Sequence, residues 1–262
     1  VERWIDQFGL EQTKILLDVD NRPAPITLRV NRLKTNRDEL IEQLRALGVE
    51  AQPSAIVDDG IVCQKLGALD DLKPLTEGLC IVQDESSMLV AHALDPKPDE
   101  FVIDCCAAPG GKSTHIAELM DNRGLVIAVD VHEHKLKLIN DNARRLGIKI
   151  VKPMVLDARE LGDEFKQRAD RVLIDAPCSG LGVLRRKADL RWRKTLDEIA
   201  QLPLLQSEIL SSAAEAGKVV ALCTGRCLSE LWDHLRLLPD IGYVICENGA
   251  CVFDIRRGRA VR

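Results

Sequence analysis

The chain has 262 residues, of which 46% are hydrophobic and 29% charged, and its net charge is −5 at pH 7. This length predicts one large or two modest domains, and we take two as the working number. No apolar run approaches the roughly 20 residues that a membrane-spanning helix needs. The negative charge excludes a protein coated with positive charge, although binding a nucleic acid requires only a local basic face.

The first residues and the cysteines bear on the cellular compartment. The start, VERWIDQFGL, has neither the basic segment nor the apolar core of a signal peptide, and a start at Val1 suggests that the chain begins inside a longer protein. Nine cysteines, an odd number, favour reduced thiols in the cytoplasm over disulfides in a chain of this length. Because there is no C-x-x-C pair and no histidine pair at ligand spacing, we expect no metal site.

The first third of the chain predicts a helix and a small module. Residues 1–22 have apolar side chains at helical spacing until the prolines of DNRPAP, so they predict a lead-in helix. Residues 23–80 predict a small α+β module, with a strand ITLRVN, a helix RDELIEQLRALG ending at Gly48, and short strands VEAQPS and GIVCQK around an Asp-Asp-Gly turn.

Residues 81–262 predict an α/β domain. From Phe101 onward the apolar strands FVIDCCA, LVIAVDV, IKIVKPMVLD, RVLIDAP and KVVALC alternate with amphipathic helices, which indicates a parallel sheet covered on both faces. A helix LSELWDHLRLLP and an antiparallel pair, YVICE and ACVFDI, follow, and Asn248-Gly249 between the two strands is a strong hairpin signal. A doubly wound sheet closed by an antiparallel hairpin is typical of Rossmann-like methyltransferases.

A glycine-rich turn and three acids predict a nucleoside site. Gly110 and Gly111 follow the first strand of this domain, where doubly wound sheets bind ligands. Asp130, Asp157 and Asp175 end three later strands, and Asp130 stands 20 residues after Gly110, where a carboxylate reaches ribose hydroxyls. Asp157 could accept from an adenine amino group. The alternatives are a tight turn without a ligand and acids that lie on the surface or cap helices.

The same turn has a second interpretation. Gly111-Lys112-Ser113 matches the end of the phosphate-binding loop of NTPases. The first glycine of that motif is replaced by Cys106, however, and Pro109 removes an N–H from a loop that would have to hold phosphates. S-adenosylmethionine has no phosphate, so the sequence favours it over ATP.

Two cysteines follow strands near the expected methyl donor. Cys178 comes three residues after Asp175, and Cys223 ends the neighbouring strand KVVALC. Methylation of carbon 5 of a cytosine requires a thiolate that adds to carbon 6 and makes carbon 5 nucleophilic. Two thiols could divide this attack and the later release of the product. The alternative for Cys223 is an ordinary buried thiol.

Four segments carry a resemblance to a known family. TLRVNRLKT, VQDESSML, CAAPGGKSTHIAELM and DAPCSGLGVLRRKADLRW resemble the RNA (cytosine-5)-methyltransferase family, in particular its bacterial branch acting on small-subunit ribosomal RNA. The resemblance covers residues 1 to about 215. It implies an RNA-recognition-like fold for the small module, Cys223 as nucleophile and Cys178 as the residue for product release, with Asp175 also facing the cytosine. DNA cytosine methyltransferases assign the attack to the Pro-Cys cysteine instead. The residues that the resemblance assigns to S-adenosylmethionine are Cys106, Ala107, Ala108, Pro109, Gly110, Gly111, Lys112, Asp130, Asp157 and Asp175.

The chain departs from the family after about residue 215. Family members usually have a Lys-Pro-Gly-Gly turn followed by Tyr-Ser-Thr-Cys, whereas this chain has SSAAEAGKVVALCTGRCLSELW. Cys223 is the best match to the family cysteine, and Cys227 is the alternative. Two hypotheses follow: an enzyme that methylates RNA, or an RNA-binding protein that keeps the fold without turnover.

The RNA contacts are predicted from local basic residues. The stretch RRKADLRWRK offers Arg185, Arg186 and Lys187 to phosphates and Trp192 for stacking or packing, with a solvated helix start as the alternative. Arg29 and Asn31 are further candidates in the small module. The sequence does not indicate an oligomeric state.

Overall fold

The computed structural model of the chain describes residues 1–64, 66–180, 183–193, 195–224, 242–246, 251–255 and 257–260. It divides into two compact units: Val1–Pro25 with Cys178–Pro203, and Ile26–Pro177 with Leu204–Arg262. Within the described residues, no helix has the length and apolar character to cross a membrane.

The first unit is mainly helical. The helix expected over residues 1–22 is two helices, α1 (Glu2–Phe8) and α2 (Leu10–Asn21), because Gly9 between them has φ 77°. The second segment of this unit contains α9 (Leu190–Arg193) and the start of α10 (Leu196–Ala216). Arg185 joins the two segments, since its guanidinium donates to the carbonyl oxygens of Arg22 (3.1 Å) and Pro23 (2.8 Å).

The second unit contains a small antiparallel sheet with strand order β2-β3-β1-β4. Its strands are β1 (Ile26–Val30), β2 (Glu50–Pro53), β3 (Gly60–Gln64) and β4 (Cys80–Val82). The helical segments between them are α3 (Arg37–Ala46), η1 (Leu69–Asp71) and α4 (Lys73–Thr76). Leu40 and Leu44 of α3 pack against Leu28 and Ile61 of the sheet. The expected small α+β module is therefore present and ferredoxin-like.

The same unit contains the larger sheet, with strand order β12-β11-β10-β9-β8-β5-β6-β7. Its strands are β5 (Phe101–Asp104), β6 (Leu125–Asp130), β7 (Val151–Val155), β8 (Ala169–Ile174), β9 (Gly217–Cys223), β10 (Tyr243–Cys246), β11 (Cys251–Asp254) and β12 (Arg259–Ala260). The other helical segments are α5 (Glu85–Leu94), α6 (Gly111–Leu119), α7 (Glu133–Leu146), η2 (Ala158–Glu160) and α8 (Leu161–Phe165). The six strands β7, β6, β5, β8, β9 and β10, in their order across the sheet, are parallel to their neighbours. Strand β11 is antiparallel to β10, and β12 is antiparallel to β11.

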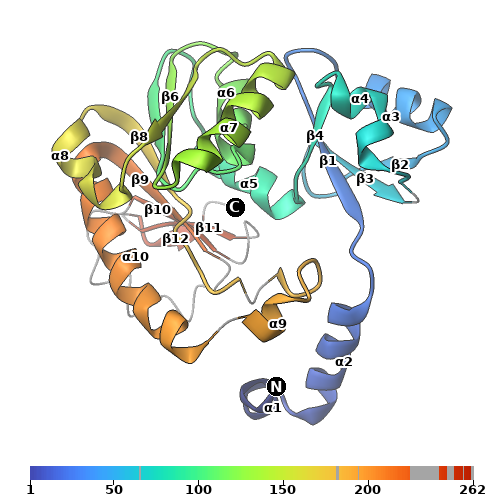
Figure 1. Ribbon diagram of the computed structural model, residues 1–262, viewed down its shortest axis with the longest axis horizontal. Helices are drawn as coiled ribbons and strands as arrows, with labels where there is room; N and C mark the ends of the chain where they lie inside the picture. Colours follow the sequence, from blue (N-terminus) through green and yellow to red (C-terminus); the bar gives the residue numbers. More distant parts are fainter. Residues whose placement is uncertain are drawn as a thin grey trace. The chain divides into compact units, whose positions relative to one another are not determined.

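Helices cover both faces of the larger sheet. Val126 and Ala128 of β6 belong to a core with α5, α6 and α7, while Ile127 and Val129 belong to a core with α8 and α10. Figure 1 shows α6 and α7 side by side over one face. This two-faced burial explains the continuous apolar strands of the sequence and confirms the Rossmann-like prediction.

The antiparallel pair predicted near the C-terminus is confirmed by β10 and β11, in which Cys246 is paired with Cys251. Asn248 and Gly249, the expected turn, lie outside the described residues, as does the helix expected over LSELWDHLRLLP.

The structure corrects the interpretation of Arg29 and Asn31 as RNA contacts. The two side chains are 0% and 1% exposed. Asn31 donates to the carbonyl oxygens of Gly78 and Leu146, each at 2.8 Å. Arg29 pairs with Glu118 of α6 at 2.8 Å. The face of the small sheet that carries them is buried within the unit, so both side chains tie the small module to the larger sheet.

Candidate functional site

The candidate site lies at the carboxyl ends of the parallel strands. Strand β5 pairs with β6 on one side and with β8 on the other, so the chain reverses its direction of winding at β5. Doubly wound proteins bind their ligands at such a switch point. Each of the predicted acids, and Cys223 as well, follows or ends one of these strands.

The glycine loop packs closely against α7 and over the end of β6. Gly110 has φ 96°, a conformation that strains an L side chain, and a Cβ at this position would lie only 3.2 Å from the Cα of Ile139. The N–H of Ala107 donates to the carbonyl oxygen of Val129 at 2.8 Å, which fixes the loop over the end of β6. Helix α6 begins directly after the loop, at Gly111. The bare backbone at Gly110 therefore lets the loop pack directly against Ile139 of α7.

The predicted acids surround the loop cysteine. Cys106 is partly buried, and burial raises the pKa of its thiol to about 12, with further upward contributions from the negative charges of Asp104, Asp175, Asp130 and Asp157. These four carboxylates therefore all lie within electrostatic reach of the loop cysteine. Such a donor-poor, acidic cradle fits a cationic nucleoside with hydroxyl and amino donors, and it would repel a triphosphate.

Asp104 belongs to this site although the sequence analysis did not select it. Its Oδ2 accepts from the hydroxyl of Ser113 at 2.7 Å, and its Oδ1 has no hydrogen-bond partner among the described residues. Burial raises the pKa of this carboxyl to about 6. A buried acceptor without a donor fits a ligand that supplies one. The available signal was a carboxylate inside the otherwise apolar strand FVIDCCA.

Asp130 and Asp157 have different surroundings. Asp130 is nearly buried at the end of β6 and accepts from the backbone N–H of His132 at 2.9 Å. Asp157 accepts from the side chain of Arg159 at 2.7 Å, and this hydrogen bond lowers the pKa of Asp157. Arg159 also reaches Glu208 at 3.2 Å. A ligand amino group at Asp157 would therefore share the carboxylate with Arg159.

Lys112, Asp175 and Cys223 come together at neighbouring strand ends. The Nζ of Lys112 lies 2.6 Å from Oδ2 of Asp175. Ile174 is paired with Leu222 in the parallel strands β8 and β9. The residues that follow them, Asp175 and Cys223, are therefore neighbours at the carboxyl ends of the two strands. Burial is the largest single effect and would lower the pKa of Lys112, but the charge and the hydrogen bond of Asp175, with smaller contributions from Cys223 and Asp104, together raise it. The partly buried Cys223 thus lies within electrostatic reach of a lysine ammonium.

The remaining candidates lie in the first unit or outside the described residues. Cys178 is exposed. Arg185, Arg186 and Lys187 are exposed as well, and Trp192 is 88% exposed. Arg186 donates to the carbonyl oxygen of Pro25 at 3.0 Å. Cys227, the alternative nucleophile, lies outside the described residues.

The fold and the geometry of the site define a class of protein, the Rossmann-like S-adenosylmethionine-dependent methyltransferases, here with a ferredoxin-like module before the methyltransferase sheet. The chain belongs to the 16S rRNA methyltransferase RsmB/F family, whose family model matches residues 91–224. A second family model, the ferredoxin-like domain of RsmF/B-like methyltransferases, matches residues 1–69.

Individual relatives agree with this assignment. The chain is 44% identical over 230 residues to "Probable ribosomal RNA small subunit methyltransferase B" of Bacillus subtilis, covering 86% of this chain and 51% of the relative. The chain thus spans about half the length of the curated relatives it matches. A methyltransferase homolog protein from Pyrococcus horikoshii is 31% identical with a TM-score of 0.72, covering 83% of this chain and 68% of that one. NSun6 from the same organism shares the fold, at 24% identity and a TM-score of 0.80, covering 92% of this chain and 86% of that one.

Proposed function

We propose that this chain methylates carbon 5 of a cytosine in RNA, and that small-subunit ribosomal RNA is the substrate. The observation that carries the proposal is the position of Cys223, at a strand end beside the pair of Lys112 and Asp175 and at the edge that holds the glycine loop. Membership of a family described as 16S rRNA methyltransferases, and relatives named as small-subunit methyltransferases, support the choice of RNA.

The residues around the loop would hold S-adenosylmethionine. When bound, this cofactor supplies a methyl group on a positively charged sulfur. The backbone at Gly110 and Gly111 would lie against it, Asp130 would accept from the ribose hydroxyls, and Asp157 would accept from the adenine amino group. The surrounding carboxylates favour the positive sulfur.

Cys223 would open the reaction. Its thiolate adds to carbon 6 of the cytosine, and the electron pair released into the ring makes carbon 5 nucleophilic enough to be methylated. The ammonium of Lys112 lies within electrostatic reach of Cys223 and would attract a thiolate formed there. Asp175 would accept from the exocyclic amino group and so orient the ring.

Cys178 would close the reaction. After methylation, carbon 5 still carries its original hydrogen, and this proton must leave before the product is aromatic again. A thiolate at Cys178 would take the proton, the electron pair would return to the ring, and the bond between carbon 6 and Cys223 would break. In this proposal two different thiols divide the attack and the release.

The test compares Cys223→Ala and Cys178→Ala, with Cys251→Ala as the matched control for loss of a partly buried thiol in β11. Cys223→Ala should transfer no methyl group and form no covalent RNA adduct. Cys178→Ala should methylate once and then retain the RNA as a complex that survives denaturing electrophoresis. Cys251→Ala should behave as the parent chain does.

Other outcomes would overturn parts of the proposal. Reversed phenotypes would make Cys178 the nucleophile. An active Cys223→Ala together with an inactive Cys227→Ala would move the attack by four positions along the sequence. A parent chain that binds RNA and transfers no methyl group to it would favour the RNA-binding hypothesis.

A further inference from the structure

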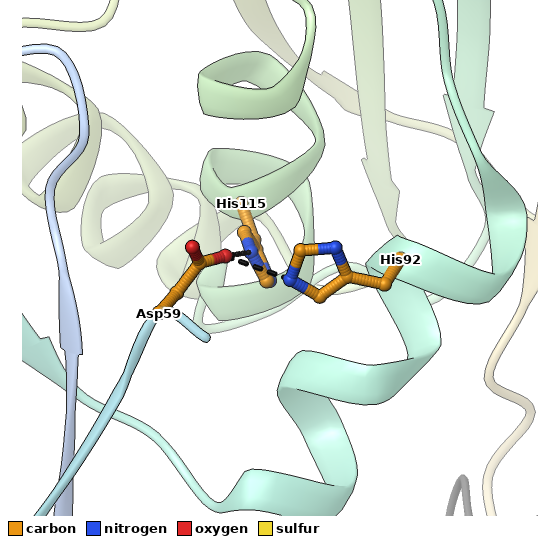
Figure 2. A group of neighbouring side chains, drawn as sticks. All are labelled: Asp59, His92 and His115. Carbon is orange, nitrogen blue, oxygen red and sulfur yellow. Dashed lines mark hydrogen bonds and ion pairs between the residues drawn. The ribbon is translucent and has the colours of Figure 1, made fainter. Parts of the chain in front are cut away.

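A second polar cluster lies away from the strand ends. Asp59 precedes β3, His92 is on α5 and His115 is on α6. The Oδ2 atom of Asp59 lies 2.7 Å from Nε2 of His92 and 3.0 Å from Nε2 of His115, so both rings point at the same oxygen (Figure 2). One atom from each residue, two imidazole nitrogens and a carboxylate oxygen, lies within 4.8 Å of the others.

The cluster contains the ligand types of a transition-metal site. Imidazole nitrogen and carboxylate oxygen together suit Zn²⁺ and its neighbours, whereas Mg²⁺ and Ca²⁺ prefer oxygen ligands alone. Zinc bonds of about 2.0–2.2 Å in a tetrahedral arrangement separate the ligand atoms by roughly 3.3 Å. The two distances to Asp59 are a few tenths of an ångström shorter, so small side-chain rotations would admit the ion.

The electrostatics also fit a cation. Asp59 supplies a carboxylate whose Oδ2 lies within hydrogen-bond distance of both imidazole rings. Arg29, the buried cation near His115, is neutralised by Glu118 at 2.8 Å. Arg32 lies 3.8 Å from the other oxygen, Oδ1, and its side chain is 54% exposed, so it can turn toward solvent.

The cluster is open on one side. His92 and Asp59 line a pocket of about 350 Å³ together with Arg32 and Asn36, while His115 is fully buried. Three protein ligands with solvent access on one side leave a fourth tetrahedral position for water.

We propose that Asp59, His92 and His115 form a binding site for a divalent transition-metal ion, with Zn²⁺ as the preferred ion. The ion joins the small sheet to α5 and α6, and α6 is the helix that begins at the glycine loop. Its role is to hold the small module against the methyltransferase sheet, and it does not depend on the proposed methyl transfer. The sequence spacing hides the site, because His92 and His115 stand 33 and 56 residues after Asp59.

The test uses the whole chain, freed of metal with a chelator and kept reduced, and titrated with Co²⁺ as a coloured probe and with Zn²⁺ in a calorimeter. The parent chain should bind one equivalent of Co²⁺, with visible d–d bands and no thiolate charge-transfer band. His92→Ala should weaken binding at least about 100-fold, above the range for loss of outer-shell partners. His134→Ala removes an exposed histidine outside the cluster and should bind as the parent does.

A second variant separates ligation from folding. Asp59→Asn keeps an oxygen that accepts from both histidines but loses the charge that a metal requires, so it should fold and yet bind Co²⁺ weakly. Zn²⁺ should raise the unfolding temperature of the parent and of His134→Ala, and not that of Asp59→Asn. A parent chain that binds no Co²⁺, a thiolate band in its spectrum, or equal affinities of the parent and Asp59→Asn would each overturn the proposal.

Discussion

Replacing Arg29 with Met should destabilise the chain by about 3–5 kcal/mol at pH 7, the range for removal of one partner from a buried ion pair. Arg29 and Glu118 are both 0% exposed, and their charged groups lie 2.8 Å apart. Methionine fills much of the volume but leaves the carboxylate without its cation. The side-chain oxygen of Gln83 and the carbonyl oxygen of Gly111 also lose the hydrogen bonds that the Arg29 guanidinium donates to them.

The loss of stability in Arg29→Met should increase as the pH rises. Burial already raises the pKa of Glu118 above its ordinary value of 4.5, with Arg29 opposing the shift. Its Oε2 has no hydrogen-bond partner among the described residues. Without Arg29 the pKa must rise further. The folded variant then keeps a proton that the unfolded chain has released, so the stability of the variant falls as pH rises through that interval. Below it, Glu118 is neutral in both states and the difference from the parent chain shrinks.

The assay is urea unfolding of the parent, Arg29→Met and Arg144→Met between pH 5 and pH 8, followed by circular dichroism. Arg144 is a matched control, because its side chain is 83% exposed and lies 3.9 Å from its partner Asp141. Exposed pairs contribute about 0–1 kcal/mol. In a parallel thermal unfolding experiment, at about 2–4 °C per kcal/mol, the unfolding temperature of Arg29→Met should fall by roughly 10 °C. A loss equal to that of Arg144→Met, or one that does not change with pH, would refute the reasoning.

Two further predictions concern the ligands. Asp130→Ala should weaken binding of S-adenosylmethionine by about 1–3 kcal/mol, the usual cost of leaving a buried polar group unpaired, and calorimetry that finds an unchanged affinity would remove Asp130 from the site. Replacing Arg185 and Arg186 together with Ala should make the fall of RNA affinity with salt less steep, by about one unit of log–log slope for each lost phosphate contact. An unaltered slope would show that these exposed arginines make no phosphate contact.

The fold was predictable from the sequence where the pattern of apolar residues is long and regular. The strands of the larger sheet are apolar along their whole length because both faces are covered, and this pattern is visible without any contact information. Strand β4, with three residues, is too short for a periodic pattern and was missed. Strand β12, with two residues, was missed for the same reason.

The candidate site was predictable in part. The glycine loop and the acids follow strand ends, so the topology brings them together without further information. The prediction for Arg29 was wrong because an arginine in a strand normally indicates an exposed face. Here the side chain is buried and is neutralised by Glu118 of α6, a helix that packs on the larger sheet. The cluster at Asp59 was missed because its members come from three separate elements. Hydropathy and local spacing do not indicate contacts between residues that are far apart in the sequence.

Every group of the proposed methyl-transfer site in the larger sheet follows the carboxyl end of a strand, and the opposite edge is formed by turns. These are residues 121–124 before β6, 147–150 before β7 and 166–168 before β8. Loop insertions and new chain termini are best tolerated at such turns. The strands therefore separate two tasks: changes in these turns are expected to affect folding, and changes at the carboxyl ends of the strands are expected to affect the chemistry. Substitutions that tune stability and substitutions that tune substrate choice can thus accumulate independently in this fold.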